Sequence, residues 1–183
     1  MEDKGRTFKS LSPTKKSLPL PLQSPIQGQI MNKPMGPSKI SDEFTCCKPI
    51  IQDCRVCRLG MVDGNRPYVI PVNFGYRDRM VYIHTGLEGK KLDAIARNPH
   101  VCVEFDTEHN LVRGAVPCKW TMHGESVVGE GTAELVQSPA EKRHALEIIM
   151  AHYGGKGNDI PDNALDTIAI IRIKLTKMTA RRV

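Results

Sequence analysis

Residues 58–99 read RLGMVDGNRPYVIPVNFGYRDRMVYIHTGLEGKKLDAIARNP, and this stretch decides the fold. Apolar runs at 57–62 and 68–76 flank the turn signal Asp63-Gly64-Asn65. Gly and Asn tolerate the positive φ angles of a tight hairpin, so the pattern predicts two antiparallel strands joined by that turn. Pro71 lies inside the second run and donates no hydrogen bond to a neighbouring strand, which predicts an edge, a bulge or a rim there.

A third strand and a helix follow the hairpin. Arg77-Asp78-Arg79 gives a second turn, and residues 80–85 form the next apolar run. Residues 90–97 carry apolar side chains at helical spacing, and Pro99 ends the helix. The predicted order is therefore strand, turn, strand, turn, strand, helix.

The loop before this helix has the composition of an anion-binding site. Residues 86–89 include two glycines, which leave backbone N–H groups open beside the positive end of a helix dipole. Lys90 and Lys91 add two ammonium groups, and His84 and Thr85 end the preceding strand on the same side. A phosphate would fit this place. Alternatively, the two lysines belong to a solvated helix face, as most lysines do.

Several motifs follow one another in a fixed order. They are Cys-Arg-Leu-Gly-Met-Val-Asp at 57–63, Pro-Tyr-Val-Ile-Pro-Val-Asn-Phe-Gly-Tyr at 67–76, Tyr-Ile-His-Thr at 82–85, Glu-Gly-Lys-Lys-Leu-Asp at 88–93, Asn-Pro-His-Val-Cys-Val-Glu-Phe-Asp at 98–106 and Cys-Lys-Trp at 118–120. The segment 56–182 that holds them resembles the pyridoxamine 5'-phosphate oxidase-like, FMN-binding split-barrel superfamily. Within that superfamily it is most similar to the branch of the 5-nitroimidazole resistance proteins.

The resemblance implies a mainly β fold, a six-stranded antiparallel split β-barrel with flanking helices. Expected strands at 126–134 and 167–178 complete the barrel. The resemblance also implies a homodimer with an FMN at each of two equivalent interface sites. A symmetric partner would cover the edges of a small open barrel.

The resemblance assigns site residues position by position. Main-chain groups of the second strand line the flavin ring, His84 and Thr85 end the third strand beside it, and the basic pair 90–91 holds the phosphate. The oxidase itself has Arg-Lys at that pair. The lysine at position 90 keeps the positive charge but cannot bind the phosphate through two parallel N–H groups, as the guanidinium of an arginine does. The cofactor-binding residues implied in this way are Val69, Ile70, Pro71, Val72, Asn73, His84, Thr85, Lys90, Lys91 and Trp120.

Two of these residues have more than one interpretation. His84 is the candidate catalytic residue, because an imidazole that titrates near neutrality can protonate a reduced substrate. It could instead only hydrogen-bond the phosphate or the ribityl chain. Trp120, the only tryptophan, could stack on the flavin ring or serve as a core or interface anchor.

The function expected from the resemblance is an FMN-dependent oxidoreductase. It would pass electrons from a reduced nicotinamide to a small electron-poor acceptor such as a nitroaromatic compound. The substrate-binding residues of the oxidase have no counterpart here, so oxidation of pyridoxamine phosphate is not expected. Two alternatives stay open, a flavin-binding or redox-sensing protein without turnover and a split barrel that holds haem or a deazaflavin.

Charge separates the first forty residues from the remainder. Residues 1–40 hold six of the thirteen prolines, seven basic residues and two acidic ones, and thus +5 of the net charge of +6. We expect a disordered basic extension over 1–40 and one barrel domain over 41–183, with no nucleic-acid or membrane partner. A targeting segment, or a start at Met31 or Met35, is an alternative explanation of the extension.

The six cysteines and one further helix complete the predictions. Cys54 and Cys57 have the spacing of a redox or metal motif, but Cys57 enters a strand, and Cys102 and Cys118 are expected inside strands as apolar residues. We therefore expect structural thiols, no metal site and a cytoplasmic location. Ser138 is the expected N-cap of a helix that buries Ala145, Leu146, Ile149 and Met150.

Overall fold

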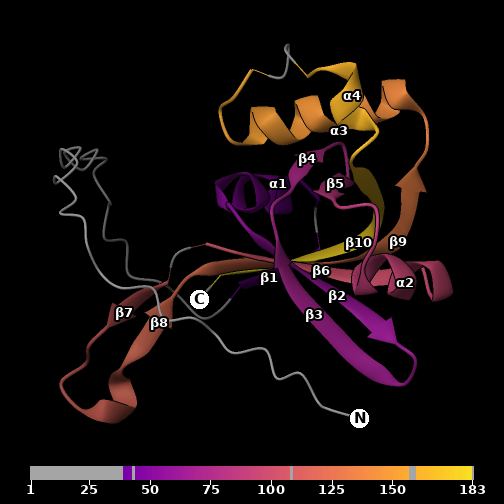
Figure 1. Cartoon of the computed structure of the whole chain (residues 1–183). Helices are drawn as coiled ribbons and strands as arrows, with labels where there is room; N and C mark the ends of the chain where they lie inside the picture. The colour runs from indigo at the N-terminus through magenta and orange to yellow at the C-terminus, as the bar shows by residue number, and fades with distance from the viewer. Residues whose placement is uncertain (1–38, 43, 108, 157–159, 183) are drawn as a thin grey trace, which may run out of the picture. The chain divides into compact units, whose positions relative to one another are not determined.

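A computed structural model describes residues 39–42, 44–107, 109–156 and 160–182. Within these residues an eight-stranded antiparallel sheet is flanked by helices (Figure 1), which confirms the predicted fold class. The elements in chain order are β1 (Lys39–Ser41), α1 (Phe44–Asp53), β2 (Cys57–Asp63), β3 (Arg66–Val72), β4 (Gly75–Arg77), β5 (Met80–Thr85), α2 (Lys90–Arg97), β6 (His100–Asp106), β7 (Asn110–Val112), η1 (Pro117–Lys119), β8 (Thr121–His123), β9 (Glu125–Val136), α3 (Pro139–His152), α4 (Asp162–Leu165) and β10 (Ala169–Arg182).

The sheet has the strand order β3-β2-β6-β9-β10-β5-β4, and the short β1 pairs with β10. Six strands were expected, and the short β1 and β4 bring the number in this sheet to eight. β3 pairs only with β2 and so forms one end of the sheet, which confirms an edge position for the strand that carries Pro71.

The expected second strand is divided in two. β3 ends at Val72, and β4 begins at Gly75, because the intervening Phe74 leaves the strand to enter the core. The turn between β4 and β5 uses Asp78 and Arg79, both at positive φ (50° and 66°). The bounds of β5 and α2 agree with the sequence prediction.

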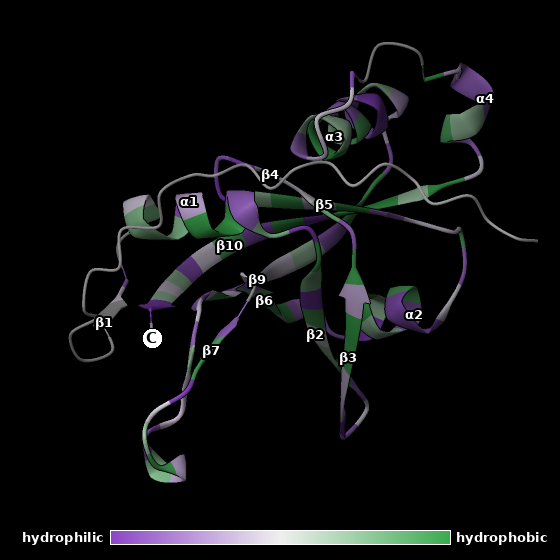
Figure 2. Cartoon of the chain, turned by 90° about the vertical axis from the view of Figure 1, so that its left-hand side faces the viewer, coloured by the Kyte–Doolittle hydropathy of each residue, from purple (hydrophilic) through white to green (hydrophobic). Residues whose placement is uncertain are grey.

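The main core lies between α1 and the sheet. Its largest fully buried side chains include Phe74 and Phe105, whose ring centroids are 5.0 Å apart in an edge-to-face arrangement. Figure 2 shows hydrophobic residues along β5, whereas on β10 hydrophobic and hydrophilic residues are interspersed. Helix α1 continues through Pro49 to Asp53, so this proline does not break the helix.

Helix α3 packs on β4 and β5 over a smaller cluster of buried residues. Ser138 is its N-cap as predicted, although the Ser138 side chain forms no capping hydrogen bond. The face that α3 buries is centred on Ala145, Ile148 and Ile149, whereas Met150 is exposed. The prediction for Met150 was therefore wrong, because the buried face is centred on Ile148, whereas Met150, two positions further on, lies on the opposite side of the helix.

A hairpin of residues 110–123 extends away from the eight-stranded sheet (Figure 1). We call it the arm; it consists of β7, η1 and β8, and its strands form a separate two-stranded sheet. Cys118 lies in η1, so its predicted place in a strand was wrong. Pro117 opens this short helical turn.

The predicted extension, residues 1–40, lies almost wholly outside the described residues, so its boundary stays a prediction. Among the described helices, none has the length and apolar character needed to cross a membrane.

Candidate functional site

A groove of about 670 Å³ lies beside the free edge of β3. The end of β5 and one residue of α2 also line it. Its volume is within the range of ligand pockets. We call this the groove, and its lining residues are Val56, Tyr68, Ile70, Pro71, Val72, Asn73, His84, Thr85 and Lys91.

The polar end of the groove is formed by Lys91 and Thr85. The Lys91 ammonium donates a hydrogen bond to the Thr85 hydroxyl, with 2.5 Å between Nζ and Oγ1. No carboxylate is found among the described residues that line the groove. No carboxylate of the described residues lies within ion-pair distance of Lys91 either. The positive charge of Lys91 is therefore available to an anionic ligand.

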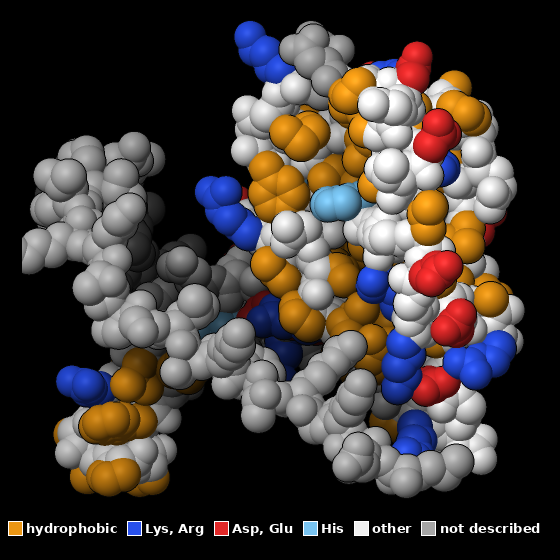
Figure 3. All heavy atoms as spheres, viewed as in Figure 1, with side chains coloured by type: hydrophobic (Ala, Val, Ile, Leu, Met, Phe, Trp, Pro, Cys, Tyr) orange, Lys and Arg blue, Asp and Glu red, His pale blue; other side chains and the backbone are white. Residues whose placement is uncertain are grey.

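Lys90 has a different environment from its neighbour. Its Nζ lies 3.1 Å from a carboxylate oxygen of Asp63 and 4.6 Å from the centre of the Tyr68 ring. Arg97 binds the other oxygen of Asp63 at 2.6 Å. The hydrogen bond from Lys90 and the two nearby cations hold the pKa of Asp63 below its usual range. Figure 3 shows the resulting mixture of acidic and basic side chains over α2.

The side chains of β3 alternate between two faces, and those that line the groove lie on one face except for the exposed Pro71. Tyr68, Ile70 and Val72 are partly buried and pack against the main core on one face. Val69 points to the other face, where its side chain is 60% exposed and lines a second hollow. Because side chains in a strand alternate between faces, only main-chain groups of Val69 can face the same ligand as Ile70.

His84 lies on β5, directly after the buried Ile83, and its exposed side chain lines the groove. β5 is held between β4 and β10, with His84 opposite Ile170 in the β10 register. β4 pairs with β5 only at residues 80–82, so at His84 the strand is held by β10 alone. The histidine can reach a ligand that occupies the groove without any rearrangement of the backbone.

Tyr153, which follows α3, fastens the loop after β3. Its hydroxyl accepts a hydrogen bond from the Phe74 N–H at 3.1 Å and donates one to the Arg55 carbonyl at 2.6 Å. Burial raises the pKa of Tyr153, so the phenol stays protonated and can keep both bonds. The two segments that it joins carry Asn73 and Val56, which both line the groove.

Seven of the residues predicted for the site therefore lie together, namely Ile70, Pro71, Val72, Asn73, His84, Thr85 and Lys91. The side chains of Val69, Lys90 and Trp120 are not among the lining residues, and their cofactor role stays a prediction. Trp120 lies on the arm, where its indole N–H donates to the Gly114 carbonyl at 3.0 Å.

Sequence reasoning missed Tyr68 and Val56. Tyr68 could have been found, since it shares the two-residue period of Ile70 and Val72. Val56 lies just before β2 and carries no recognisable signal. It reaches the groove because Cys57 pairs with Val72 and so places Val56 near Asn73.

The buried cysteines are not among the residues that line the groove. Burial raises the pKa of Cys54 to about 11 and that of Cys57 to about 12, so both remain protonated at neutral pH. The Cys54 thiol donates to the Ile50 carbonyl at 3.1 Å. In the described part of the chain no group of three or more His, Cys, Asp or Glu side chains is arranged to hold a metal ion. These thiols behave as core residues.

The groove suits an elongated ligand with an anionic end. Lys91 and Thr85 offer an ammonium and a hydroxyl to a phosphate. Next to them, the apolar side chains of Ile70 and Val72 on β3 line the groove. The outer edge of β3 leaves main-chain donors and acceptors for the heteroatoms of a ring. The donor set therefore fits a flavin mononucleotide.

Comparison with known proteins agrees with this description. A family model for pyridoxamine 5'-phosphate oxidase matches residues 45–182. A candidate 5-nitroimidazole antibiotic resistance protein from Bacteroides thetaiotaomicron is 33% identical, with a TM-score of 0.72 over 79% of this chain and 87% of that chain. No curated protein matches the sequence.

More distant structures share the fold. The FAD and haem binding protein from Mycobacterium smegmatis has a TM-score of 0.71 at 15% identity, over 79% of this chain and 73% of its own. A FAD-binding protein from Mesorhizobium loti has a TM-score of 0.60 at 23% identity, over 81% of this chain and 99% of its own. At these identities the likeness concerns the fold alone.

Proposed function

This chain belongs to the pyridoxamine 5'-phosphate oxidase-like family, and we propose that it is an FMN-dependent oxidoreductase that reduces a small electron-poor acceptor. A nitroaromatic compound such as a 5-nitroimidazole is the proposed acceptor class. The likeness to a candidate 5-nitroimidazole resistance protein supports that choice.

The observation that carries the proposal is the polar end of the groove. Lys91 presents a charge that no carboxylate lining the groove neutralises, and its hydrogen bond to Thr85 sets a hydroxyl beside it. A phosphate placed there would accept hydrogen bonds from both groups, and charge-assisted bonds of this kind are strong. The rest of the ligand would then lie along the edge of β3.

In this proposal the polar end of the groove, the edge of β3 and Tyr153 have different roles. Lys91 and Thr85 hold the phosphate, and the outer edge of β3 orients the ring through main-chain groups of residues 69–73. Bound FMN would supply the electron transfer, and the protein supplies position and electrostatics. Tyr153 keeps the two sides of the groove at a fixed spacing.

His84 is the proposed proton donor. Its exposed imidazole lines the groove, and β10 pairs with the strand at this position, so the imidazole can meet an acceptor that lies over the ring. A protonated imidazole, which carries a proton on both ring nitrogens, gives one up readily near neutral pH. The proton would pass from the His84 ring nitrogen to the acceptor as the acceptor gains electrons.

The proposal includes a homodimer and a reduced nicotinamide as electron donor. The free edge of β3 beside an open groove is a surface that a symmetric partner could cover. A cytoplasmic location also belongs to the proposal, because all six cysteines are free thiols and a reducing compartment keeps them so.

The first test is the visible spectrum of the purified protein, followed by titration of its cofactor-free form with FMN. We expect saturable binding of one FMN per chain and turnover of NADH or NADPH with a 5-nitroimidazole. Binding without turnover would show that the protein binds flavin and would contradict the proposed enzymatic activity. A haem Soret band or a deazaflavin spectrum without FMN binding would overturn the cofactor assignment.

A further inference from the structure

A cavity of about 260 Å³ lies where β4 packs against α3, apart from the residues that line the groove. Figures 1 and 2 show β4 between α1 and α3, and all three elements contribute residues to the cavity. We call this cavity the α1–α3 pocket. Its lining residues are Lys48, Gln52, Tyr76, Arg77, Asp78, Ile148, Ala151 and His152.

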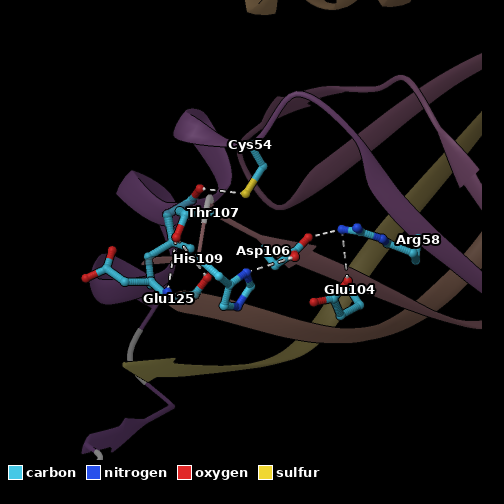
Figure 4. Close-up of polar contacts among 8 residues, drawn as sticks. Cys54, Arg58, Glu104, Asp106, Thr107, His109 and Glu125 are labelled. Atoms are coloured by element: carbon cyan, nitrogen blue, oxygen red, sulfur yellow. Dashed lines mark hydrogen bonds and ion pairs between the residues drawn. The ribbon is translucent and has the colours of Figure 1, made fainter. Parts of the chain in front are cut away.

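Close packing fixes the walls of the α1–α3 pocket. A Cβ at Gly75 would lie 2.7 Å from backbone atoms of Ile149, so β4 and α3 approach closely enough to exclude a side chain at this position. On the other side, Nε2 of His152 lies 2.8 Å from the carbonyl oxygen of Cys54, the residue that follows α1. The Cys54 thiol is in turn bonded to a carbonyl of α1 (Figure 4). The protein alone therefore holds the pocket open, as is usual for ligand sites.

The charged groups of the α1–α3 pocket have both signs. Lys48 supplies an ammonium and Arg77 a guanidinium, and Asp78 supplies the only carboxylate among the described lining residues. None of these three side chains forms an ion pair or a hydrogen bond with another residue of the described chain. Two cations and a carboxylate thus border one cavity without neutralising one another.

Other charge clusters of the described chain pair directly. Arg58 binds Asp106 and lies 3.6 Å from Glu104 (Figure 4). Arg172 lies 2.8 Å from Glu134 in the same way. Single unpaired charges are common on protein surfaces, but those of the α1–α3 pocket border one cavity with rigid walls. Such an arrangement favours a ligand that carries the complementary charges.

Neutral polar groups complete the lining. Burial raises the pKa of Tyr76, so its hydroxyl stays protonated and can donate a hydrogen bond. The Gln52 amide can both donate and accept. Because the Cys54 carbonyl can only accept, Nε2 of His152 carries a hydrogen, and Nδ1 is left as the acceptor of the neutral ring. The pocket therefore offers donors and acceptors beside its charges.

We propose that the α1–α3 pocket binds a small zwitterion, with its carboxylate at Lys48 and Arg77 and its ammonium at Asp78. A free amino acid is the simplest molecule that carries both groups. Ile148 and Ala151 add apolar surface, which suits a short aliphatic side chain. The proposal involves neither the groove nor its cofactor, so it stands or falls independently of the proposed function.

Three related molecules test the proposal. L-valine carries both charged groups, isovalerate is valine without the ammonium, and isobutylamine is valine without the carboxylate. Each is titrated into the full chain by isothermal titration calorimetry. We expect L-valine to bind at one molecule per chain and each analogue to bind about tenfold or more weakly, because each leaves a charge of the pocket unmatched. No binding of L-valine, or equally tight binding of either analogue, would overturn the proposal.

Variants separate the two ends of the ligand. Asp78→Asn should weaken the binding of L-valine about tenfold, since a hydrogen bond to a charged group is lost, and should leave the binding of isovalerate unchanged. Arg77→Gln should weaken the binding of both. Asp78 has a φ of 50°, which Asn also tolerates, so Asp78→Asn should fold, as circular dichroism can check.

Arg66→Gln is the matched control, because Arg66 is exposed on β3 and does not line the α1–α3 pocket. It should bind L-valine as the parent does. An Asp78→Asn variant with the parental affinity for L-valine would contradict the proposed place of the ammonium. An Arg77→Gln variant with the parental affinity for both ligands would contradict that of the carboxylate.

Discussion

The groove and the arm are both open to water, but they are built in opposite ways. The groove takes side chains from β3, β5 and α2, and each of these elements is backed by the buried core. In the part of the chain that the structure describes, the polar contacts that fasten the arm to the sheet lie at its root, at Thr107, Glu125 and around Asp106. The solvent exposure of side chains alone therefore does not distinguish a ligand-binding site from a protein-docking surface. An unneutralised charge in a firmly backed groove favours a small anionic ligand, whereas an apolar arm held at one end favours a second protein surface.

The largest effect should follow from removing His84 from the groove. If this imidazole protonates the acceptor, His84→Ala should lower turnover about 100-fold or more, the usual contribution of general acid catalysis. FMN affinity should change little, because Lys91 and Thr85 hold the phosphate. Steady-state rates with a 5-nitroimidazole and FMN titrations of the same preparations measure the two quantities.

His144→Ala is the matched control, since His144 is exposed on α3, close to Glu147 and outside the groove. It should keep the parental rate. A His84→Ala enzyme with full turnover would remove the proton-donor role. It would leave the groove as a binding site whose chemistry comes from elsewhere.

The two adjacent lysines give the next largest effect. Lys91→Ala should weaken FMN binding roughly tenfold to a hundredfold, corresponding to about 1.5–3 kcal/mol for hydrogen bonds to a charged group. Lys90→Ala should weaken it only slightly, because Lys90 is paired with Asp63. Fluorescence titration of both variants with FMN gives the comparison.

Riboflavin, which lacks the phosphate, is the control ligand. Its affinity should be the same for Lys91→Ala and the parent. If the variant with both lysines replaced binds FMN as the parent does, the phosphate site has been placed wrongly. A larger loss in Lys90→Ala than in Lys91→Ala would show that Lys90 leaves Asp63 when the ligand binds.

These lysines also show what the sequence could predict. The strand-turn-strand-helix pattern of residues 57–99 is local, so hydrogen-bonded turns and periodicity were sufficient to predict β2, β5 and α2 and to bring His84, Thr85 and Lys91 together. The difference between Lys90 and Lys91 depends on Asp63, which is 27 positions before Lys90 and reaches it only in the folded chain. No local pattern carries that information.

The arm was harder to predict for a related reason. Leu111, Val112 and Met122 have the composition of a buried hairpin, and only the fold shows that nothing in the described chain covers them. Trp120 was expected near the flavin or at an anchor position, and the structure places it at the tip of the arm. Burial is a property of the assembled sheet, so apolar composition alone could not separate a core strand from an exposed one.

Alanine substitutions at Gly75, in the core, and Gly114, in the arm, compare how much each region contributes to the free energy of unfolding. A Cβ at Gly75 would lie 2.7 Å from backbone atoms of Ile149, where α3 packs on β4. Gly75→Ala should therefore lower the free energy of unfolding by about 1–3 kcal/mol, as overpacking in a core does. A Cβ at Gly114 would be equally crowded, 2.7 Å from the Lys119 carbonyl oxygen, but that contact lies within the arm.

Gly114→Ala should change the free energy of unfolding by less than about 0.5 kcal/mol, because the arm can distort without disturbing the main core. Urea unfolding of both variants tests this, at a protein concentration where the chain is monomeric. A Gly114→Ala loss as large as that of Gly75→Ala would show that the arm is an integral part of the folded unit.

A smaller loss than that of Gly75→Ala is expected from removing the two hydrogen bonds of Tyr153. Tyr153→Phe leaves the Phe74 N–H and the Arg55 carbonyl without their partner, which should cost about 1 kcal/mol of unfolding free energy. Tyr82→Phe is the control, since the structure records no hydrogen bond of that hydroxyl to another described residue.

Because Tyr153 spans the segments of Val56 and Asn73, the loss of its hydroxyl should also loosen one wall of the groove. FMN should then bind a few times more weakly to Tyr153→Phe and with unchanged affinity to Tyr82→Phe. Equal FMN affinities in the two variants would mean that the core alone holds the groove in place, and that Tyr153 contributes only to stability.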